Sequence, residues 1–564
     1  MVVIKDFRRD FYETIHGQRI LVLVAFDVDA LCALKILQYL FQCDQVLYTI
    51  VPVAGRQDMD RAFIENGEGI KYVLLLNCGG CMDIVEQLQP PDDVVFFICD
   101  SHRPIDVHNI YNVKQVKILA KSHDLQDVPE FDDVFRDESD DDDSGNESEG
   151  SEASGKKRRF DEDAIEKRRA KRLWEENREK ILYEYTEFTY QGCSAAMTVF
   201  EMAWKMSKDT NDLLWIACIG LTDQYIHYKI NREKYVDCIG DLQNHVSRLN
   251  HRGADEESRI SVDCLKVSFE DDMLLNLYRH WTLYDSLCHS AVSACQFKIW
   301  TMKGKKRLDE FLADMGLPLS QCRQKYSAMD MSLRNSVKEM IETKSEKYGI
   351  STRDIFLPSF VAQYGFKNRL SAMDAAYACA ALLESVDKNK ADSDKYLNAL
   401  DLLSRSNRQV LQVGLDFAKM QVKAIVNQVQ TFLDMNQIIS AGPFLYAFIT
   451  EGTADIKFFS RPICLQRLAK FTLQAHVAMS RSKKAPQLPL IVGAPMDSEI
   501  GMTLICGIPP LAEDDGKNVY GKAFEQAAIN TNARILQDSF DTHIVELQTA
   551  DRSKFFDALI ALMQ

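Results

Sequence analysis

The stretch LVLVAFDVDALCALKIL, from Leu21 to Leu37, decides the fold of the first part of the chain. It opens with an unbroken apolar run, which is typical of a strand covered on both faces. Two acids, Asp27 and Asp29, follow at once, and an apolar helical pattern begins near Ala30. A buried strand that passes straight into a helix predicts the first unit of a parallel α/β sheet.

Strand and helix patterns keep alternating up to residue 99. After a strand at Ile20–Phe26 and a helix at Ala30–Phe41, the pattern predicts in turn a strand at Gln45–Val51, a helix at Met59–Asn66, a strand at Tyr72–Leu76, a helix at Met82–Gln89 and a strand at Val94–Cys99. Right-handed crossovers join such strands into one parallel sheet. The prediction for residues 1–230 is therefore an α/β domain.

Polar residues stand where these strands end. Beyond the first, third and fourth strands they are, in order, Asp27 and Asp29, Asn77, and Asp100, Ser101 and His102. Because ligands bind beyond the carboxyl ends of parallel strands, these residues predict a site at one edge of the sheet. In the alternative, purely structural interpretation, Asp27 or Asp29 caps the helix that follows. Asp100 and His102 then only hold a strand-end turn.

The remaining chain divides by composition into three parts. Residues 132–163 hold 14 acids and 5 bases, and so much like charge with so few apolar groups predicts a disordered insert. Residues 231–400 are mostly helical in pattern, with Ile260–Phe269 as an extended exception. Residues 401–564 begin with a long amphipathic connecting helix at Gln409–Leu433 and continue with mixed strand and helix patterns. This last part predicts a second, smaller α/β domain.

Composition excludes several classes of protein. The net charge is −16, so nucleic acid would have to bind a local basic patch, such as Lys303–Arg307 or Arg481–Lys484. The apolar runs are far shorter than the roughly 20 residues of a membrane span. The pattern GxxxxGK[ST] does not occur, which argues against a P-loop and against a helicase motor. Fifteen scattered cysteines favour reduced thiols inside the cell over a disulfide framework.

Cys78 and Cys81 have the spacing of a redox pair or of half a zinc site. A structural zinc site needs a second pair of ligands, and none is evident in the sequence at a suitable spacing. The pair also falls where a loop beside the predicted site is expected. We therefore expect no cofactor at these cysteines.

Two short signals lie in or beside the acidic insert. A basic cluster predicts nuclear import or, alternatively, a solvated patch that balances its acidic neighbour; its members are Lys156, Lys157, Arg158, Arg159, Lys167, Arg168 and Arg169. Four serines among the acids are candidate phosphorylation sites, where added negative charge would keep the segment extended. They are Ser139, Ser144, Ser148 and Ser151.

The layout AFDVDAL…NCGG…CDSH…GLTDQ resembles the DHH phosphoesterase superfamily, which includes the RecJ nucleases. The resemblance implies that an Asp-x-Asp pair, a later lone Asp, an Asp-His-His and a further Asp hold two divalent metals. Two neighbouring cations need several anionic oxygens to neutralise and bridge them. Asp223, which follows the apolar run Leu213–Leu221, matches the last of these ligands.

The chain departs from this pattern at two metal ligands. Asn77 replaces the bridging aspartate and Ser101 replaces the first histidine. An amide carries no charge, and a hydroxyl is a poor substitute for imidazole. The C-terminal region that carries a glycine- and histidine-rich motif in RecJ nucleases offers Gly521–Phe524 without a histidine. We therefore expect a vestigial metal site without catalysis, with a single weak magnesium ion as an alternative; its positions are Asp27, Asp29, Asn77, Asp100, Ser101, His102 and Asp223.

Longer stretches resemble one family of this superfamily, the eukaryotic cell-division-cycle protein 45. They are QGCSAAMTVFEMAW, IGLTDQYIH, KKRLDEFLADMGLPL, SAGPFLYAFITEGTADIKFFSRP and KAFEQAA…DRSKFFDALIALM. The resemblance implies an inactive RecJ relative with a DHH domain, a helical middle domain and a DHH-associated C-terminal domain. It also implies a nuclear, non-motor subunit of the replicative helicase. Its partners would be the MCM hexamer, the GINS complex, replication-initiation factors and DNA polymerases.

Three functions stay open at this point. The first is a non-catalytic replication scaffold, with weak or local contact to single-stranded DNA and no contact to membranes. The second is a metal-dependent single-strand exonuclease or phosphoesterase of RecJ type. The third is a free-standing single-strand binding protein, in which basic and aromatic groups alone recognise the DNA backbone and bases.

Overall fold

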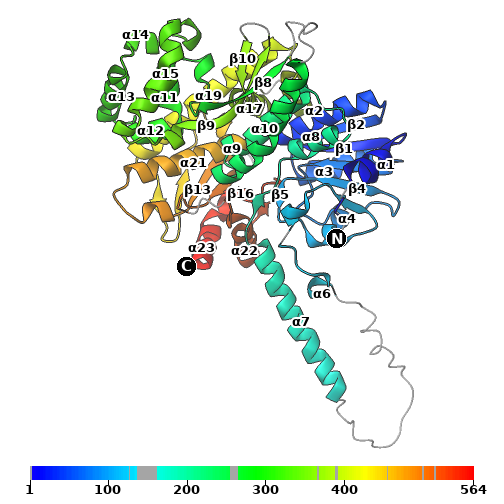
Figure 1. Ribbon diagram of the computed structural model, residues 1–564. Helices are drawn as coiled ribbons and strands as arrows, with labels where there is room; N and C mark the ends of the chain where they lie inside the picture. Colours follow the sequence, from blue (N-terminus) through cyan, green and yellow to red (C-terminus); the bar gives the residue numbers. More distant parts are fainter. Residues whose placement is uncertain are drawn as a thin grey trace, which may run out of the picture.

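A computed structural model describes residues 3–4, 6–125, 127–135, 162–254, 265–364, 368–387, 391–453, 455–497, 501–512 and 516–564. Within these ranges the chain forms three sheets and one short pair of strands, with helices packed around each sheet (Figure 1). None of the described helices combines the length and the apolar content that a membrane span needs.

The first sheet is parallel throughout, which confirms the predicted α/β fold. In spatial order its strands are β2 (Leu47–Val53), β1 (Arg19–Ala25), β3 (Tyr72–Leu76), β4 (Val95–Cys99) and β6 (Val116–Ile118). The central strands β1 and β3 are buried along almost their whole length. Helices cover both faces, which explains why these strands are apolar without alternation.

The helices around this sheet place the residues of the predicted site. Helix α2 (Val28–Cys43) packs against α8 (Ala195–Lys205) and α9 (Asn211–Ile226). The crossovers α3 (Arg56–Asn66), α4 (Ile84–Leu88) and α5 (Val107–Tyr111) complete the layers, with short helices α1 (Glu13–Ile15) and α6 (Phe131–Val134) at the margins. Because α8 and α9 cover α2, nearly every residue of its first three turns is buried.

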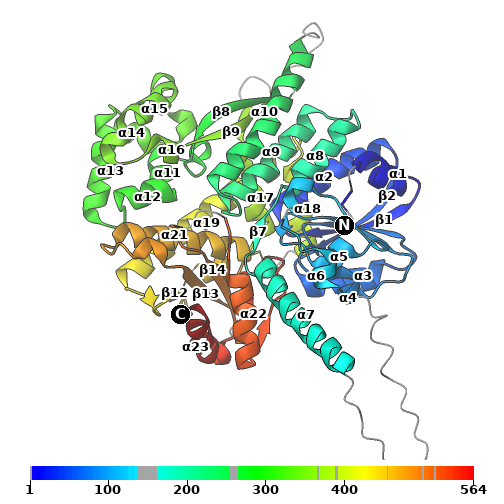
Figure 2. The same cartoon turned by 60° about the horizontal axis from the view of Figure 1, so that its bottom comes forward.

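Helix α7 (Glu162–Thr186) projects from the body of the molecule (Figures 1 and 2). It is anchored around its middle, where the Trp174 indole donates to the Asp132 carbonyl at 3.1 Å and Arg178 donates to the Val134 carbonyl at 2.8 Å. The serines and the cluster Lys156–Arg159 lie outside the described residues. Side chains of α7 are described only from residue 169, where Arg169 is exposed.

The middle region is mostly helical, as predicted, but one sheet interrupts the helices. It contains an antiparallel sheet of β8 (Lys266–Met273), β9 (Phe356–Tyr364) and β10 (Asn368–Ser371). The extended signal at Ile260–Phe269 overlaps β8, but β9 was not predicted, because Pro358 and Ser359 interrupt its apolar run. Strand β9 is stabilised by pairing with β8 along its length, which a local pattern cannot show.

Helices of the middle region form two groups. The first group lies in a second core of buried side chains, to which the C-terminal part also contributes: α11 (Leu283–His289), α12 (Ala291–Phe297), α13 (Met302–Asp314), α14 (Leu319–Cys322), α15 (Met331–Lys344) and α16 (Thr352–Ile355). The second group joins the core of the first sheet: α10 (Arg232–Ala254), α17 (Ala372–Leu383) and α18 (Asp392–Leu402). The long helix α19 (Arg408–Asp434) contributes to both cores, in agreement with the predicted connecting helix.

The C-terminal part is the predicted second α/β unit. Its mixed sheet runs in the order β11 (Ile439–Ser440), β12 (Leu445–Phe448), β13 (Leu490–Asp497), β14 (Met502–Ile508), β16 (Ile544–Gln548) and β15 (Ile535–Leu536). Leu490 and Val492 pack in the core that contains α20 (Ile456–Phe459) and α21 (Pro462–Met479). Ile491 packs in the core with α22 (Tyr520–Thr531) and α23 (Arg552–Met563). Alternation along β13 therefore supplies both faces of the sheet. Domain boundaries near residues 230 and 400 stay predictions.

Helix α13 provides a direct test of this second core. Phe311 is fully buried with its ring centroid 5.0 Å from that of Tyr348, whereas Met302 on the same helix is 75% exposed. Phe311→Ala should destabilise this core by about 3–5 kcal/mol, because the cavity it leaves adds to the lost burial. Met302→Ala is the matched control and should leave the urea midpoint unchanged. Equal midpoints for the two variants would contradict the assigned packing.

Candidate functional site

The structure gathers all seven predicted residues at the carboxyl edge of the first sheet. Asp27 follows β1, Asn77 follows β3, Asp100 to His102 follow β4, and Asp223 lies in the last turn of α9. All seven are buried. The site therefore forms a polar cluster enclosed by the ends of the strands and by α2, α8 and α9.

Asn77 lies at the centre of this cluster. Its side-chain nitrogen donates to Asp27 Oδ2 at 2.7 Å and to Asp29 Oδ2 at 3.1 Å. Its side-chain oxygen accepts from the Ser101 backbone N–H at 3.0 Å. The backbone φ of 50° is left-handed, a conformation that asparagine tolerates better than most residues. The amide thus donates hydrogen bonds to two carboxylates, whereas a bridging aspartate would bind cations.

Lys229 brings a positive charge into the site. Its ammonium nitrogen lies 2.5 Å from Asp27 Oδ1 and 3.4 Å from Asp223 Oδ2, and its side chain is only 8% exposed. Burial disfavours the charged lysine, but Asp27 and Asp223 outweigh burial and raise its pKa above the ordinary value. Burial likewise opposes the ionised Asp27, and Lys229 outweighs it and lowers that pKa. An internal cation therefore stands between two of the carboxylates that a metal would need.

The Asp29 side chain binds the N-terminal end of helix α8. Its carboxylate accepts from the backbone N–H groups of Ala195 at 2.8 Å and Ala196 at 3.0 Å, and from the Ser194 hydroxyl. Burial and the nearby Asp27 raise its pKa to about 6. The capping interpretation predicted a cap on the helix that follows the strand. Asp29 instead caps a helix distant in sequence, and Asp27 makes no side-chain cap bond to α2.

His102 is held between two carboxylates. Its Nδ1 lies 2.6 Å from Asp100 Oδ1 and its Nε2 lies 3.3 Å from Asp541 Oδ1. Burial disfavours the imidazolium, but Asp100 and Asp541 outweigh burial and raise the pKa of His102 to about 10. With both ring nitrogens protonated, this side chain has no lone pair for a metal.

Ser101, next to His102, holds two short strands together. Its hydroxyl donates to Gln191 Oε1 at 2.8 Å, which ties β5 (His102–Arg103) to β7 (Tyr190–Gln191). Gly521–Phe524 begins α22, and the C-terminal part instead supplies Asp541 to the site. Sequence reasoning missed Lys229, Asp541 and Gln191. The one available signal was Lys229, a lone base that follows Asp223 closely at the end of an apolar helix.

The residues present do not fit a two-metal centre. The cations Lys229 and His102 already pair with Asp27, Asp223, Asp100 and Asp541. Across the described residues, no group of three or more histidine, cysteine, aspartate or glutamate side chains is arranged to hold a metal ion. Burial raises the pKa of Cys78 and of Cys81 well above the thiol range, which disfavours the thiolate needed for redox chemistry or zinc.

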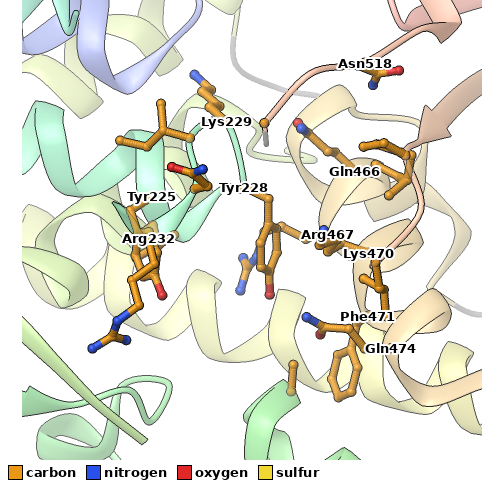
Figure 3. A pocket seen from close by; sticks show the side chains of 18 of the residues that line it. Tyr225, Tyr228, Lys229, Arg232, Gln466, Arg467, Lys470, Phe471, Gln474 and Asn518 are labelled. Atoms are coloured by element: carbon orange, nitrogen blue, oxygen red, sulfur yellow. The ribbon is translucent and has the colours of Figure 1, made fainter. Parts of the chain in front are cut away.

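A cavity of about 760 Å³ opens beside this cluster. His102, Lys229 and Asp541 line one part of it, and residues of α21 line another. Figure 3 shows Lys229 near residues from the α9–α10 connection and from α21. The cluster is thus the floor of a larger opening between the first sheet, the middle helices and the C-terminal sheet.

Comparison with known proteins gives a consistent match over the whole chain. The CDC45 family model matches residues 20–134 and 120–561. The human cell division control protein 45 homolog is 48% identical over 99% of this chain and all of its own length. A crystal structure of CDC45 from Entamoeba histolytica is 24% identical, has a TM-score of 0.70 and covers all of this chain and 99% of that one. The Entamoeba crystal structure supports the fold that we assign to this chain. A RecJ exonuclease bound to manganese matches with a TM-score of 0.41 and 11% identity, over 97% of this chain and 90% of that one. This similarity is too distant to support an inference.

Metal binding tests the role of Lys229 and Asn77. Replacing both, as Asn77→Asp with Lys229→Ala, removes the internal cation and restores a carboxylate. Calorimetric titration should then show Mn²⁺ binding at least about tenfold tighter than in the unchanged chain. Lys229→Ala alone is the control for loss of the ammonium. Equally tight Mn²⁺ binding by the unchanged chain would show that the site still accepts the metal.

The charged state of His102 predicts a pH-dependent part of stability. Its folded pKa of about 10 lies above the ordinary value of 6.5, so folding retains a proton that the unfolded chain releases. The stabilisation is complete below about pH 6.5 and is lost as pH rises through about 10. Urea midpoints of the unchanged chain and of His102→Gln should therefore converge with rising pH. A difference that stays constant across this window would contradict the ion pair.

Proposed function

This chain belongs to the CDC45 family, and on that premise we propose that it is a non-catalytic DNA replication factor of the nucleus. It acts as a scaffold subunit of the replicative helicase, binds the MCM hexamer and GINS, and is required for replication initiation and fork progression. It works alongside replication-initiation factors and DNA polymerases. The observation that carries the non-catalytic part is the Lys229 ammonium between Asp27 and Asp223.

The chemistry of hydrolysis supports this assignment. Metal-dependent cleavage needs cations that activate water and neutralise the leaving oxygen. Here Lys229 already neutralises Asp27 and Asp223, and Asn77 donates to Asp27 and Asp29. An ammonium cannot bind and ionise a water molecule as a divalent metal does. The cluster can therefore hold the fold together, but it lacks the groups for phosphodiester hydrolysis.

The outer surface suits a scaffold. Two exposed methionines, Met302 on α13 and Met331 on α15, place adaptable apolar groups on the surface of the middle helices. Helix α7 extends a second surface away from the body (Figure 2). A chain that joins several partners needs such separate faces, since each interface buries its own patch.

The cavity supports local guidance of single-stranded DNA. Its lining combines cationic side chains such as Arg232 and Lys470 with the rings of Tyr190 and Tyr228. Positive charge follows a nucleic-acid backbone and aromatic rings stack on bases, so these groups match the chemistry of single-strand binding. The contact is local because the whole chain carries a net charge of −16.

One set of assays tests the scaffold against a residual exonuclease. The purified chain should not shorten labelled single-stranded DNA in the presence of Mn²⁺, and it should co-purify with MCM and GINS when these are co-expressed. Loss of terminal nucleotides that Asp27→Ala abolishes would instead establish the RecJ-type activity. Absence of both co-purification and cleavage, with tight DNA binding by the chain alone, would favour a free-standing single-strand binding protein.

A further inference from the structure

The part of the cavity along α21 forms a distinct pocket. Figure 3 shows side chains of the α9–α10 connection on one side and side chains of α21 on the other. Gln466, Lys470 and Gln474 follow one another at intervals of four, as do Arg467 and Phe471, so they form two neighbouring rows along the helix. Its opposite face packs in the C-terminal core. We call this part of the cavity the α21 pocket; the residues used below are Tyr228, Gln466, Arg467, Lys470, Phe471 and Gln474.

Arg467 is a buried cation that attracts the buried Glu384 carboxylate through space but makes no direct ion pair with it. It is only 6% exposed, and no ion pair to its guanidinium occurs among the described residues. Its guanidinium instead lies 4.6 Å from the centre of the Tyr377 ring. Burial of a charge that makes no direct ion pair is costly, which favours an anion in the pocket. The planar fork of arginine matches the oxygens of a phosphate group.

Lys470 adds a second cation one helical turn further along α21. Its ammonium lies 5.8 Å from the centre of the Tyr228 ring and is only partly exposed. Arg232 lies on the other wall, where its guanidinium donates a hydrogen bond to the Phe356 carbonyl at 2.9 Å. The pocket therefore has positive groups on two walls. Of the two acids that line the cavity, Asp541 is paired with His102, and Asp354 lies two residues before Phe356, on the side of Arg232.

The pocket also presents aromatic surfaces against which a ring can pack, and a hydrogen-bond acceptor that has no donor. Phe471 is buried in its wall, and Tyr228 lies at its mouth with a backbone φ of 61°. A left-handed backbone is unfavourable for a bulky residue, so local contacts must hold this ring in place. Gln474 Oε1 is buried and has no hydrogen-bond partner within the described residues. Such an acceptor needs a donor from a bound molecule or from water.

We propose that the α21 pocket binds a nucleoside monophosphate. The phosphate pairs with Arg467 and Lys470, the base lies against Tyr228 and Phe471, and Gln474 accepts an N–H of the base. The whole cavity, at about 760 Å³, is in the size range of small-molecule sites. The nucleotide is either a free mononucleotide or the phosphorylated end of a DNA strand. This binding goes beyond the scaffold function and does not depend on MCM or GINS.

Calorimetric titration of the full chain tests the pocket. The probes are deoxyadenosine 5′-monophosphate, deoxyadenosine, inorganic phosphate, and a short oligodeoxyadenylate with and without a 5′-phosphate. We expect the monophosphate to bind at least about tenfold more tightly than deoxyadenosine or phosphate alone. The pair of oligonucleotides separates the sources: preference for the phosphorylated strand over the monophosphate assigns the site to a strand end.

Variants connect this binding to the pocket. Lys470→Met should weaken binding of the phosphorylated probe at least about tenfold, because the phosphate loses a cation. Lys483→Met, an exposed lysine just beyond α21, is the matched control and should bind as the unchanged chain does. Arg467→Lys retains the charge without the fork and should also weaken binding. An unchanged thermal midpoint shows that each variant is folded.

Two results would overturn the proposal. One is that neither phosphorylated probe binds more tightly than its counterpart without phosphate. The other is that folded Lys470→Met binds as tightly as Lys483→Met. Neither result bears on co-purification with MCM and GINS, so failure of the pocket and failure of the scaffold function are distinguishable.

Discussion

The ion pairs of Lys229 with Asp27 and Asp223 are the constraint on which the site depends. Four buried carboxylates, those of Asp27, Asp29, Asp100 and Asp223, meet at one sheet edge, and like charges at such distances repel strongly in a medium of low dielectric. A divalent metal is one solution to this repulsion. This chain uses an ammonium from its own sequence, together with the Asn77 amide and a raised pKa on Asp29. The cluster is thereby satisfied without an external cation.

The same charge compensation joins distant parts of the chain. His102 lies at the end of the first sheet and contacts Asp541, which precedes the last strand of the C-terminal sheet. Ser101 binds Gln191, and Asp29 caps α8. The residues of the predicted site thus hold elements of this fold together. The parts of the molecule thereby keep a defined arrangement without a bound ion.

The cavity lies where three parts of the molecule meet. The first sheet, the middle helices and the C-terminal sheet each bury one face in a core and leave polar ends toward a shared opening. Helix α21 shows the arrangement clearly, since one face packs in the C-terminal core while Arg467 and Lys470 line the opening. Cavities at such junctions are common sites for ligands.

Local sequence was enough for the parallel sheet, the connecting helix and the seven residues at the sheet edge. These features depend on apolar runs and on the rule that strand ends converge, both of which are readable along the chain. Strand β9 could not be predicted from the sequence, because Pro358 and Ser359 interrupt its apolar pattern and its stability comes from pairing with β8. Lys229 and Asp541 were missed because neither lies in a motif, and Lys229 is 202 residues from Asp27. The sequence thus determined which carboxylates gather, and only the tertiary structure decided which cations neutralise them, since electrostatic pairing depends on distance in space.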